Sequence, residues 1–174
     1  MPILPIRLYP DPVLRVECPP VETFDEALQE LANDMVETMY AAPGVGLAAP
    51  QVGVEKRLAV VDVSVGKEPG QLKILVNPRI VEQDGREVDS EGCLSIPGLS
   101  EKVRRPKVVE VVAQNLEGEE VQFEAEDFEA RAICHEIDHL NGVLFVDHLR
   151  GLRKDRARRQ LKRLLRSQET TASE

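Results

Sequence analysis

Apolar residues recur at every third or fourth position in three stretches of the chain, which is the spacing of a helix that buries one face. The first stretch runs from about Phe24 to Tyr40, and either Thr23 or Asp25 could cap its first turn. The second covers residues 127–141, and the third follows residue 148 and runs to about Arg166. The pattern therefore predicts one helix in the first quarter of the chain and two helices in the last third.

Between these helices the pattern changes to short runs rich in Val, Ile and Leu, separated by Gly, Pro or Asn. Such runs predict strands, whereas residues 92–98 indicate a punctuated loop or a short strand. The proline-rich first twenty residues predict an extended, irregular arm. Strands in the middle and helices on both sides indicate an α+β fold, with antiparallel or mixed sheets packed around a central helix. The predicted strands are Arg57–Val63, Lys73–Val76, Arg79–Glu82, Val108–Gln114 and Glu120–Ala125.

The composition is that of a globular protein. The chain has 174 residues, of which 42% are hydrophobic and only 3% aromatic, so its core must be mainly aliphatic. No apolar run approaches the roughly 20 residues that a membrane helix needs, and the N-terminus lacks the apolar segment of a secretory signal. We therefore expect a cytoplasmic protein that does not bind membranes.

Charge is distributed unevenly along the chain. Residues 1–149 hold 13 basic and 28 acidic side chains, whereas residues 150–166 hold nine Lys or Arg and one Asp. The acidic body argues against DNA or other nucleic acid as the main substrate. The basic segment either docks on this acidic body or binds an anionic partner. We expect a single main domain over residues 1–149, a basic helix over 150–166 and a flexible tail over 167–174.

The helix at 127–141 carries residues suited to bind a metal ion. His135, Glu136 and His139 form an H-E-x-x-H sequence, in which two imidazoles one helical turn apart lie on the same face. One divalent cation can accept a nitrogen from each, and the Glu136 carboxylate at the edge of the site can take a proton from water. Phe128 and Ala132 follow the same stripe and could form apolar walls. The alternative is a surface helix with incidental histidines.

A third protein ligand has to come from elsewhere in the chain. Downstream of the helix, His148 is a weak candidate. Upstream, Cys93 within EGCLSIPG is the best candidate, because two histidines and one thiolate leave a fourth position for water. Cys134 lies about 100° around the helix from His135 and cannot easily reach the same ion. Cys18, in the proline-rich arm, is expected to be a packed small hydrophobe.

Three segments, GVGLAAPQVG, EGCLSIPG and HEIDHLNG, follow one another along the chain. In content and order they resemble the three motifs of the peptide deformylase family. The resemblance extends from the N-terminal arm to about residue 149, so it makes the main domain, 1–149, the catalytic one. It implies a metal-dependent hydrolase that removes the formyl group from the N-terminal formylmethionine of nascent proteins and releases formate.

The resemblance also implies the residues of the site. One divalent ion per chain, usually Fe²⁺ with Ni²⁺, Co²⁺ or Zn²⁺ able to substitute, would be held by the motif Cys and two His, here Cys93, His135 and His139. Glu136 corresponds to the catalytic glutamate, Gln51 to the motif glutamine, and Leu94 to the residue after the Cys ligand.

These roles agree with amide hydrolysis. Glu136 would take the proton of metal-activated water as it attacks the formyl carbon, and then deliver it to the leaving amine. The Gln51 side-chain amide and the Leu94 backbone N–H would donate to the oxyanion. The substrate peptide would pair with glycine-rich backbone, and the substrate-binding residues are expected to be Gly44, Val45, Gly46 and Gly92. Taken alone, GVGLAAPQVG is more typical of a tightly packed turn.

Two other functions stay open. Another H-E-x-x-H metallo-amidase or peptidase would share the helix motif, and a non-catalytic ribosome-binding relative would share the fold. In similar bacterial enzymes a C-terminal helix contacts the ribosome, and the basic charge here fits an RNA surface, so deletion of residues 150–174 is predicted to weaken ribosome association. Arg105 is expected to be structural and to pair with Glu91 or Asp138.

Overall fold

The fold consists of two antiparallel sheets around one central helix. A computed structural model describes residues 3–172. The larger sheet has five strands in the order β1-β2-β3-β6-β7, and β4 and β5 form a separate two-stranded sheet. All strand pairs are antiparallel. The strands are β1 (Gly46–Ala48), β2 (Leu58–Val61), β3 (Lys73–Asp84), β4 (Glu87–Cys93), β5 (Ile96–Arg105), β6 (Val108–Gln114) and β7 (Glu120–Glu126).

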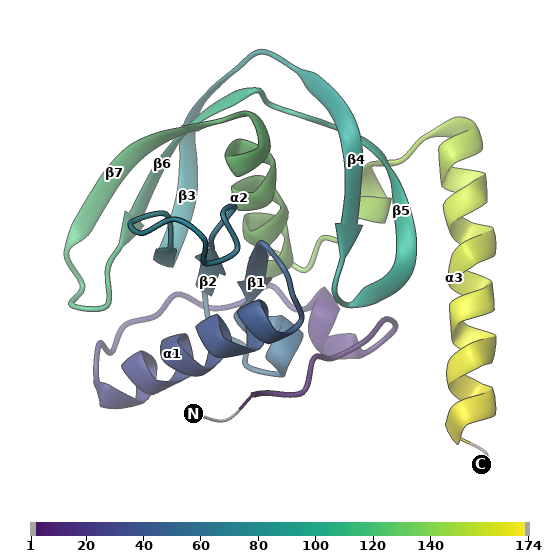
Figure 1. The fold of residues 1–174 in the computed structure, drawn as a ribbon, viewed down its shortest axis with the longest axis horizontal. Helices are drawn as coiled ribbons and strands as arrows, with labels where there is room; N and C mark the ends of the chain where they lie inside the picture. The colour runs from purple at the N-terminus through teal and green to yellow at the C-terminus, as the bar shows by residue number, and fades with distance from the viewer. Residues whose placement is uncertain (1–2, 173–174) are drawn as a thin grey trace.

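Figure 1 shows the central helix α2 enclosed between the larger sheet and the β4–β5 hairpin, with α3 at the edge of the molecule beside β5. Helix α1 packs against β1 and β2 on another side. The predicted α+β architecture around a central helix is therefore confirmed. The helices are α1 (Glu26–Ala41), α2 (Asp127–Leu140) and α3 (Gly151–Ala172), with 3₁₀ turns η1 (Pro12–Arg15), η2 (Ala49–Val52) and η3 (Phe145–His148).

Apolar faces of the helices build an aliphatic core. Of the two candidate caps of α1, Asp25 is the one that acts, since its side chain accepts a hydrogen bond from the Leu28 backbone N–H at 3.0 Å. Helix α2 turns Ala130 and Ile133 toward the strands, where they pack in one cluster with buried valines of the larger sheet. This packing fixes α2 from behind and leaves its other face for the site.

Residues 73–84 form one strand, although the sequence pattern predicts two. The pairing of β3 with β6 shifts register between Val76 and Arg79, where Asn77 has a φ of 51° before Pro78. The Asn77 side-chain amide donates to Val21 O at 2.9 Å and to Gln114 Oε1 at 2.7 Å. The strand thus accommodates Pro78 in a β-bulge, because the side-chain hydrogen bonds of Asn77 stabilise the irregular backbone.

The β4–β5 hairpin is much longer than the loop or short strand predicted at residues 92–98. The pattern failed here because the only buried residue of β4 is charged, Glu91, and no apolar alternation marks the strand. A strand whose buried side chain is a carboxylate lacks the alternation of apolar and polar residues by which strands are predicted from sequence.

Helix α3 continues past Arg166 to Ala172, so residues 167–172 of the predicted flexible tail are helical in the structure, and residues 173–174 lie outside the described part. Buried Ala157 joins an apolar cluster with Leu99 and Val103. The Gln168 side chain donates to the Tyr9 carbonyl at 2.9 Å. The helix therefore contacts the body between Ala157 and Gln168, and no glycine or proline interrupts it after Gly151.

Within residues 3–172, no helix has both the length and the apolar composition that crossing a membrane requires.

Candidate active site

Three potential metal ligands converge from two different elements. His135 and His139 stand one turn apart on α2, and Cys93 is the last residue of β4. The hairpin register shifts between Gly92 and Cys93, so the thiol is turned toward the helix at an irregularity of the ladder. The Nε2 atoms of the two histidines lie 3.1 Å apart, and the Cys93 Sγ lies 3.3 Å from His139 Nε2. All three ligand atoms lie within 4.8 Å of one another, the one such group among the described residues.

This donor set fits a divalent metal ion. Nitrogen and sulfur ligands bound to one tetrahedral ion lie roughly 3.3–3.6 Å apart, close to the separations of 3.1 and 3.3 Å found for two of the three pairs. Burial, together with the neighbouring His135, holds the pKa of His139 well below its usual range, so this imidazole is neutral as a ligand must be. For His135, burial opposes protonation, but Glu136 and Cys93 outweigh it and raise its pKa. Surroundings that attract a proton to this point also favour a cation.

Glu136 is buried beside these ligands. Its Oε1 atom has no hydrogen-bond partner among residues 3–172, and neither does Nδ1 of His139. Burial raises the pKa of Glu136 to about 7, against the opposing effect of His135. A Cβ atom at Gly46 would lie 2.6 Å from Glu136 Oε2, so the glycine leaves room for this carboxylate. A buried, unpartnered carboxylate with a near-neutral pKa can both accept and return a proton.

Gln51 lies next to the thiol. Its Oε1 accepts the Ala48 backbone N–H at 3.0 Å, which turns Nε2 toward Ser95 Oγ at 3.1 Å and Cys93 Sγ at 3.7 Å. Ser95 is fully buried and was not predicted as a site residue. The amide nitrogen is therefore held at the ligand cluster.

These residues line one cleft of about 650 Å³. It contains Cys93, His135 and Glu136, whereas His139 lies behind the wall and is 1% exposed. Phe128 and Ala132 line it as the helix stripe predicts. The predicted residues Gly44, Val45, Gly46, Gln51, Gly92 and Leu94 all belong to the lining.

The proline-rich arm supports the site from behind. The Arg7 N–H donates to Gln51 O at 2.7 Å, and the Tyr9 N–H donates to Ser95 O at 2.8 Å. None of residues 3–20 lines the cleft. The arm therefore fixes two of the segments that carry site residues and leaves the opening free.

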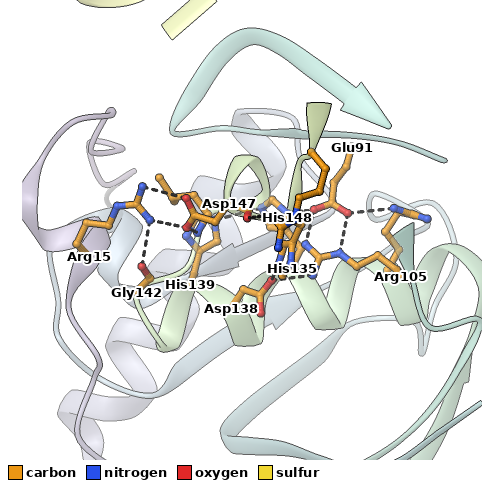
Figure 2. Close-up of polar contacts among 12 residues, drawn as sticks. Arg15, Glu91, Arg105, His135, Asp138, His139, Gly142, Asp147 and His148 are labelled. Atoms are coloured by element: carbon orange, nitrogen blue, oxygen red, sulfur yellow. Dashed lines mark hydrogen bonds and ion pairs between the residues drawn. The ribbon is translucent and has the colours of Figure 1, made fainter. Parts of the chain in front are cut away.

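An ionic cluster backs His135, and Figure 2 labels three of its members, Glu91, Arg105 and Asp138. Glu91 Oε2 lies 2.7 Å from His135 Nδ1, and Arg105 binds Glu91 and Asp138 through separate nitrogens. The predicted pairing of Arg105 is thus confirmed for both partners. Arg131, the second guanidinium on Glu91, was missed, since no sequence signal distinguishes a buried arginine from an exposed one on a helix.

The remaining candidates lie apart from the ligand group. Cys134 packs in the core against the larger sheet, and burial raises its pKa to about 11, so it stays a thiol. Cys18 is buried, as expected of a small hydrophobe. His148 pairs with Asp138 at 2.8 Å.

Comparison with known proteins gives a consistent picture. A family model described as "Polypeptide deformylase" matches residues 3–155. The chain belongs to the polypeptide deformylase family. It is 47% identical to the peptide deformylase of Acidobacterium capsulatum over 97% of this chain and 99% of the relative. It is 56% identical to peptide deformylase 1 of Clostridium acetobutylicum over 86% of this chain and 96% of the relative.

Solved structures of the same family share the fold. The peptide deformylase of Legionella pneumophila superposes with a TM-score of 0.88 at 46% identity, covering 97% of this chain and 98% of its own. As a polypeptide deformylase, the chain is a metal-binding hydrolase that removes the N-formyl group from formylmethionine of nascent peptides.

Proposed function

We propose that Cys93, His135 and His139 hold one divalent cation and that Glu136 moves the proton in formyl hydrolysis. The observation that carries this proposal is the convergence of three ligand atoms at a cleft wall beside an unpartnered Glu136 oxygen. The ion in the cell is Fe²⁺, and because a thiolate with two imidazoles suits several first-row metals, Ni²⁺, Co²⁺ or Zn²⁺ can replace it.

The bound ion would supply a Lewis acid that polarises the formyl oxygen and lowers the pKa of water. Glu136 accepts the proton of the attacking water on its free Oε1 and returns it to the leaving amine nitrogen. Burial of this carboxylate excludes bulk water, which keeps the proton available for the return step.

Gln51 and Leu94 stabilise the oxyanion. The Gln51 amide nitrogen is already oriented toward Cys93, and a rotation from Ser95 Oγ to the substrate would let it donate to the developing charge. Leu94 follows Cys93 directly in the turn between β4 and β5, so its backbone N–H lies next to the ligand.

The substrate peptide binds in the same cleft. Gly44, Val45, Gly46 and Gly92 line this cleft and offer backbone that an extended peptide can approach. Backbone pairing is tolerant of sequence, which suits an enzyme that acts on many different nascent chains.

Helix α3 contributes a second contact, to the ribosome. Its Arg158, Arg159, Lys162 and Arg163 are exposed, and they follow residue 155, where the family match ends. Nascent formylated chains are made by ribosomes, so we place the protein in the cytoplasm. Changing these four residues to Gln should weaken cosedimentation with ribosomes at about 0.1 M salt. Equal cosedimentation of both proteins would contradict this role.

The catalytic proposal is tested by formate release from a formyl-Met-Ala-Ser peptide. The wild-type protein, purified without air and loaded with Fe²⁺ or Ni²⁺, should release formate rapidly. Glu136→Ala should retain one metal per chain and lose about 10²–10⁴-fold in rate. A metal-replete variant with wild-type turnover would exclude Glu136 as the proton carrier, and no release by the metallated wild type would favour another metallo-amidase.

A further inference from the structure

The metal ligands depend on the alignment of two separate elements. Cys93 belongs to the β4–β5 hairpin, and both histidines belong to α2. Apolar packing orders the other face of α2 against the larger sheet. On the side that faces the hairpin, the side chains that join the two elements are charged and buried: Glu91 from β4, Arg105 from β5 and Arg131 from α2.

Glu91 acts directly on a ligand. Its Oε2 atom lies 2.7 Å from Nδ1 of His135, and both side chains are nearly inaccessible to water. Because a carboxylate only accepts hydrogen bonds, a hydrogen resides on Nδ1, and Nε2, which lies 3.1 Å from His139 Nε2, is the nitrogen that a metal ion can take. Hydrogen bonding of this kind orients a ligating imidazole and raises its basicity.

Arg105 holds Glu91 in that position. Its Nε and Nη2 atoms bind the two carboxylate oxygens at 3.0 and 2.6 Å, while Nη1 binds Asp138 on α2 at 2.7 Å (Figure 2). One guanidinium therefore spans the hairpin and the metal helix. Although it is buried, Arg105 does not line the cleft, so it cannot touch substrate there.

Arg131, on α2, binds Glu91 and the backbone of the hairpin. Its Nη1 atom binds Glu91 Oε1 at 3.2 Å and the Val103 carbonyl at 2.8 Å, and Nη2 binds the Glu87 carbonyl at 3.0 Å. Two guanidiniums face two carboxylates, Glu91 and Asp138, so the formal charges cancel within the cluster. Such a buried cluster tolerates only a narrow geometry, since removal of one member leaves the others unpaired.

We infer that Glu91 and Arg105 are positioning residues for the metal centre: together they fix the tautomer of His135 and align the Cys93 hairpin with α2. The inference rests on the proposed ligand set. It assigns to Arg105, a residue remote from the substrate, an effect on the affinity and geometry of the metal site.

The test compares Glu91→Gln and Arg105→Lys with a matched control, Glu129→Gln. Glu129 also lies on α2 and forms an ion pair with Lys73 of β3 at 2.6 Å, but it touches no proposed ligand. Each protein is loaded with Co²⁺, its visible absorption spectrum is recorded, and transfer of Co²⁺ to a chelator is followed. Thermal unfolding of the metal-free proteins reports stability separately.

We expect Glu91→Gln and Arg105→Lys to bind Co²⁺ about 10–100-fold more weakly and to show shifted cobalt bands, whereas Glu129→Gln matches the wild type. If both variants lose only metal-free stability and keep the wild-type Co²⁺ spectrum and affinity, the cluster is merely structural and the inference is wrong. A wild-type Co²⁺ spectrum without a thiolate-to-metal band would instead overturn the ligand set. Arg105→Lys keeps the charge, so it serves as the decisive variant if Glu91→Gln folds poorly.

Discussion

Helices α2 and α3 are both rich in ionisable residues, but they place them in opposite environments. Helix α2 buries Arg131, His135, Glu136 and His139, each no more than 8% exposed. Helix α3 leaves its Arg and Lys residues in water, and Ala157 is the only buried residue among its described side chains. Burial, rather than the number of charges, makes α2 the helix that carries reactive side chains. Away from water, the hydrogen-bonding and charged partners of a side chain fix its tautomer and shift its pKa. The charges of α3 are exposed, including Arg156 in its ion pair with Glu101 at 3.2 Å, so water and salt screen their interactions.

Removal of a ligand from α2 should have the largest effect. In His139→Ala we expect the bound metal to be lost and formate release to fall by about 10³-fold or more, since the lost Lewis acid is worth several kcal/mol. Metal content per chain and peptide turnover are measured on the same sample. His148→Ala is the control, because this histidine lies outside the ligand group and should keep its metal. Full metal content in His139→Ala would remove this residue from the ligand set.

A smaller effect is expected where α2 meets β1. Gly46→Ala would place a Cβ atom 2.6 Å from Glu136 Oε2 and displace the carboxylate. We expect turnover to fall by about 10²-fold with metal content unchanged, since a shift of about 1 Å at a catalytic group costs this much. In Gly92→Ala the nearest atom, a backbone oxygen, lies at 3.4 Å, so a weaker loss is expected. Equal losses in both variants would contradict the steric explanation.

Asp62 tests whether burial alone is sufficient for chemistry. This residue is 1% exposed but lies outside the cleft, and it accepts hydrogen bonds from Tyr40, Ser64 and Gly66. Burial alone would raise its pKa, but these donors, Tyr40 first, lower it below its usual value. We expect Asp62→Asn to lose about 1–3 kcal/mol of unfolding free energy at pH 7 with unchanged turnover.

The pH dependence of this loss has a defined sign. Because the folded pKa of Asp62 is depressed, its stabilisation is complete above the unfolded value of about 3.9 and disappears as the pH falls through the folded pKa. Urea unfolding at pH 7 and near pH 3 should therefore show that the difference in unfolding free energy between wild type and Asp62→Asn becomes smaller in acid. An equal difference in unfolding free energy at both pH values would mean that the charge of the Asp62 carboxylate does not cause the stabilisation.

The smallest overall effect, on both turnover and stability, is expected on α3. Replacement of Arg158, Arg159, Lys162 and Arg163 by Gln should leave turnover of a short formyl peptide within about twofold, since exposed charges contribute little to stability or to a remote site. The assay is formate release at physiological and low salt. A loss above tenfold with a short peptide would show that the two helices are coupled.

Much of the site could be predicted from the sequence. The H-E-x-x-H spacing is local, because helical geometry alone puts His135 and His139 on one face. Strands β2, β6 and β7 and helix α1 were predicted from hydrophobic period, since each buries one apolar face. The β4–β5 hairpin was not, because the residue that β4 buries is Glu91 and its partners are brought from other elements.

The sequence by itself therefore determined the ligand types, the helix that carries two of them and the separation of acidic body from basic helix. Only the tertiary structure decided that Cys93 meets that helix, that Gly46 makes room for Glu136, and that Arg105 joins the hairpin to α2. The physical reason is the range of the interactions. Helical period and capping act over three or four residues, whereas a buried carboxylate takes its partners from wherever the fold supplies them.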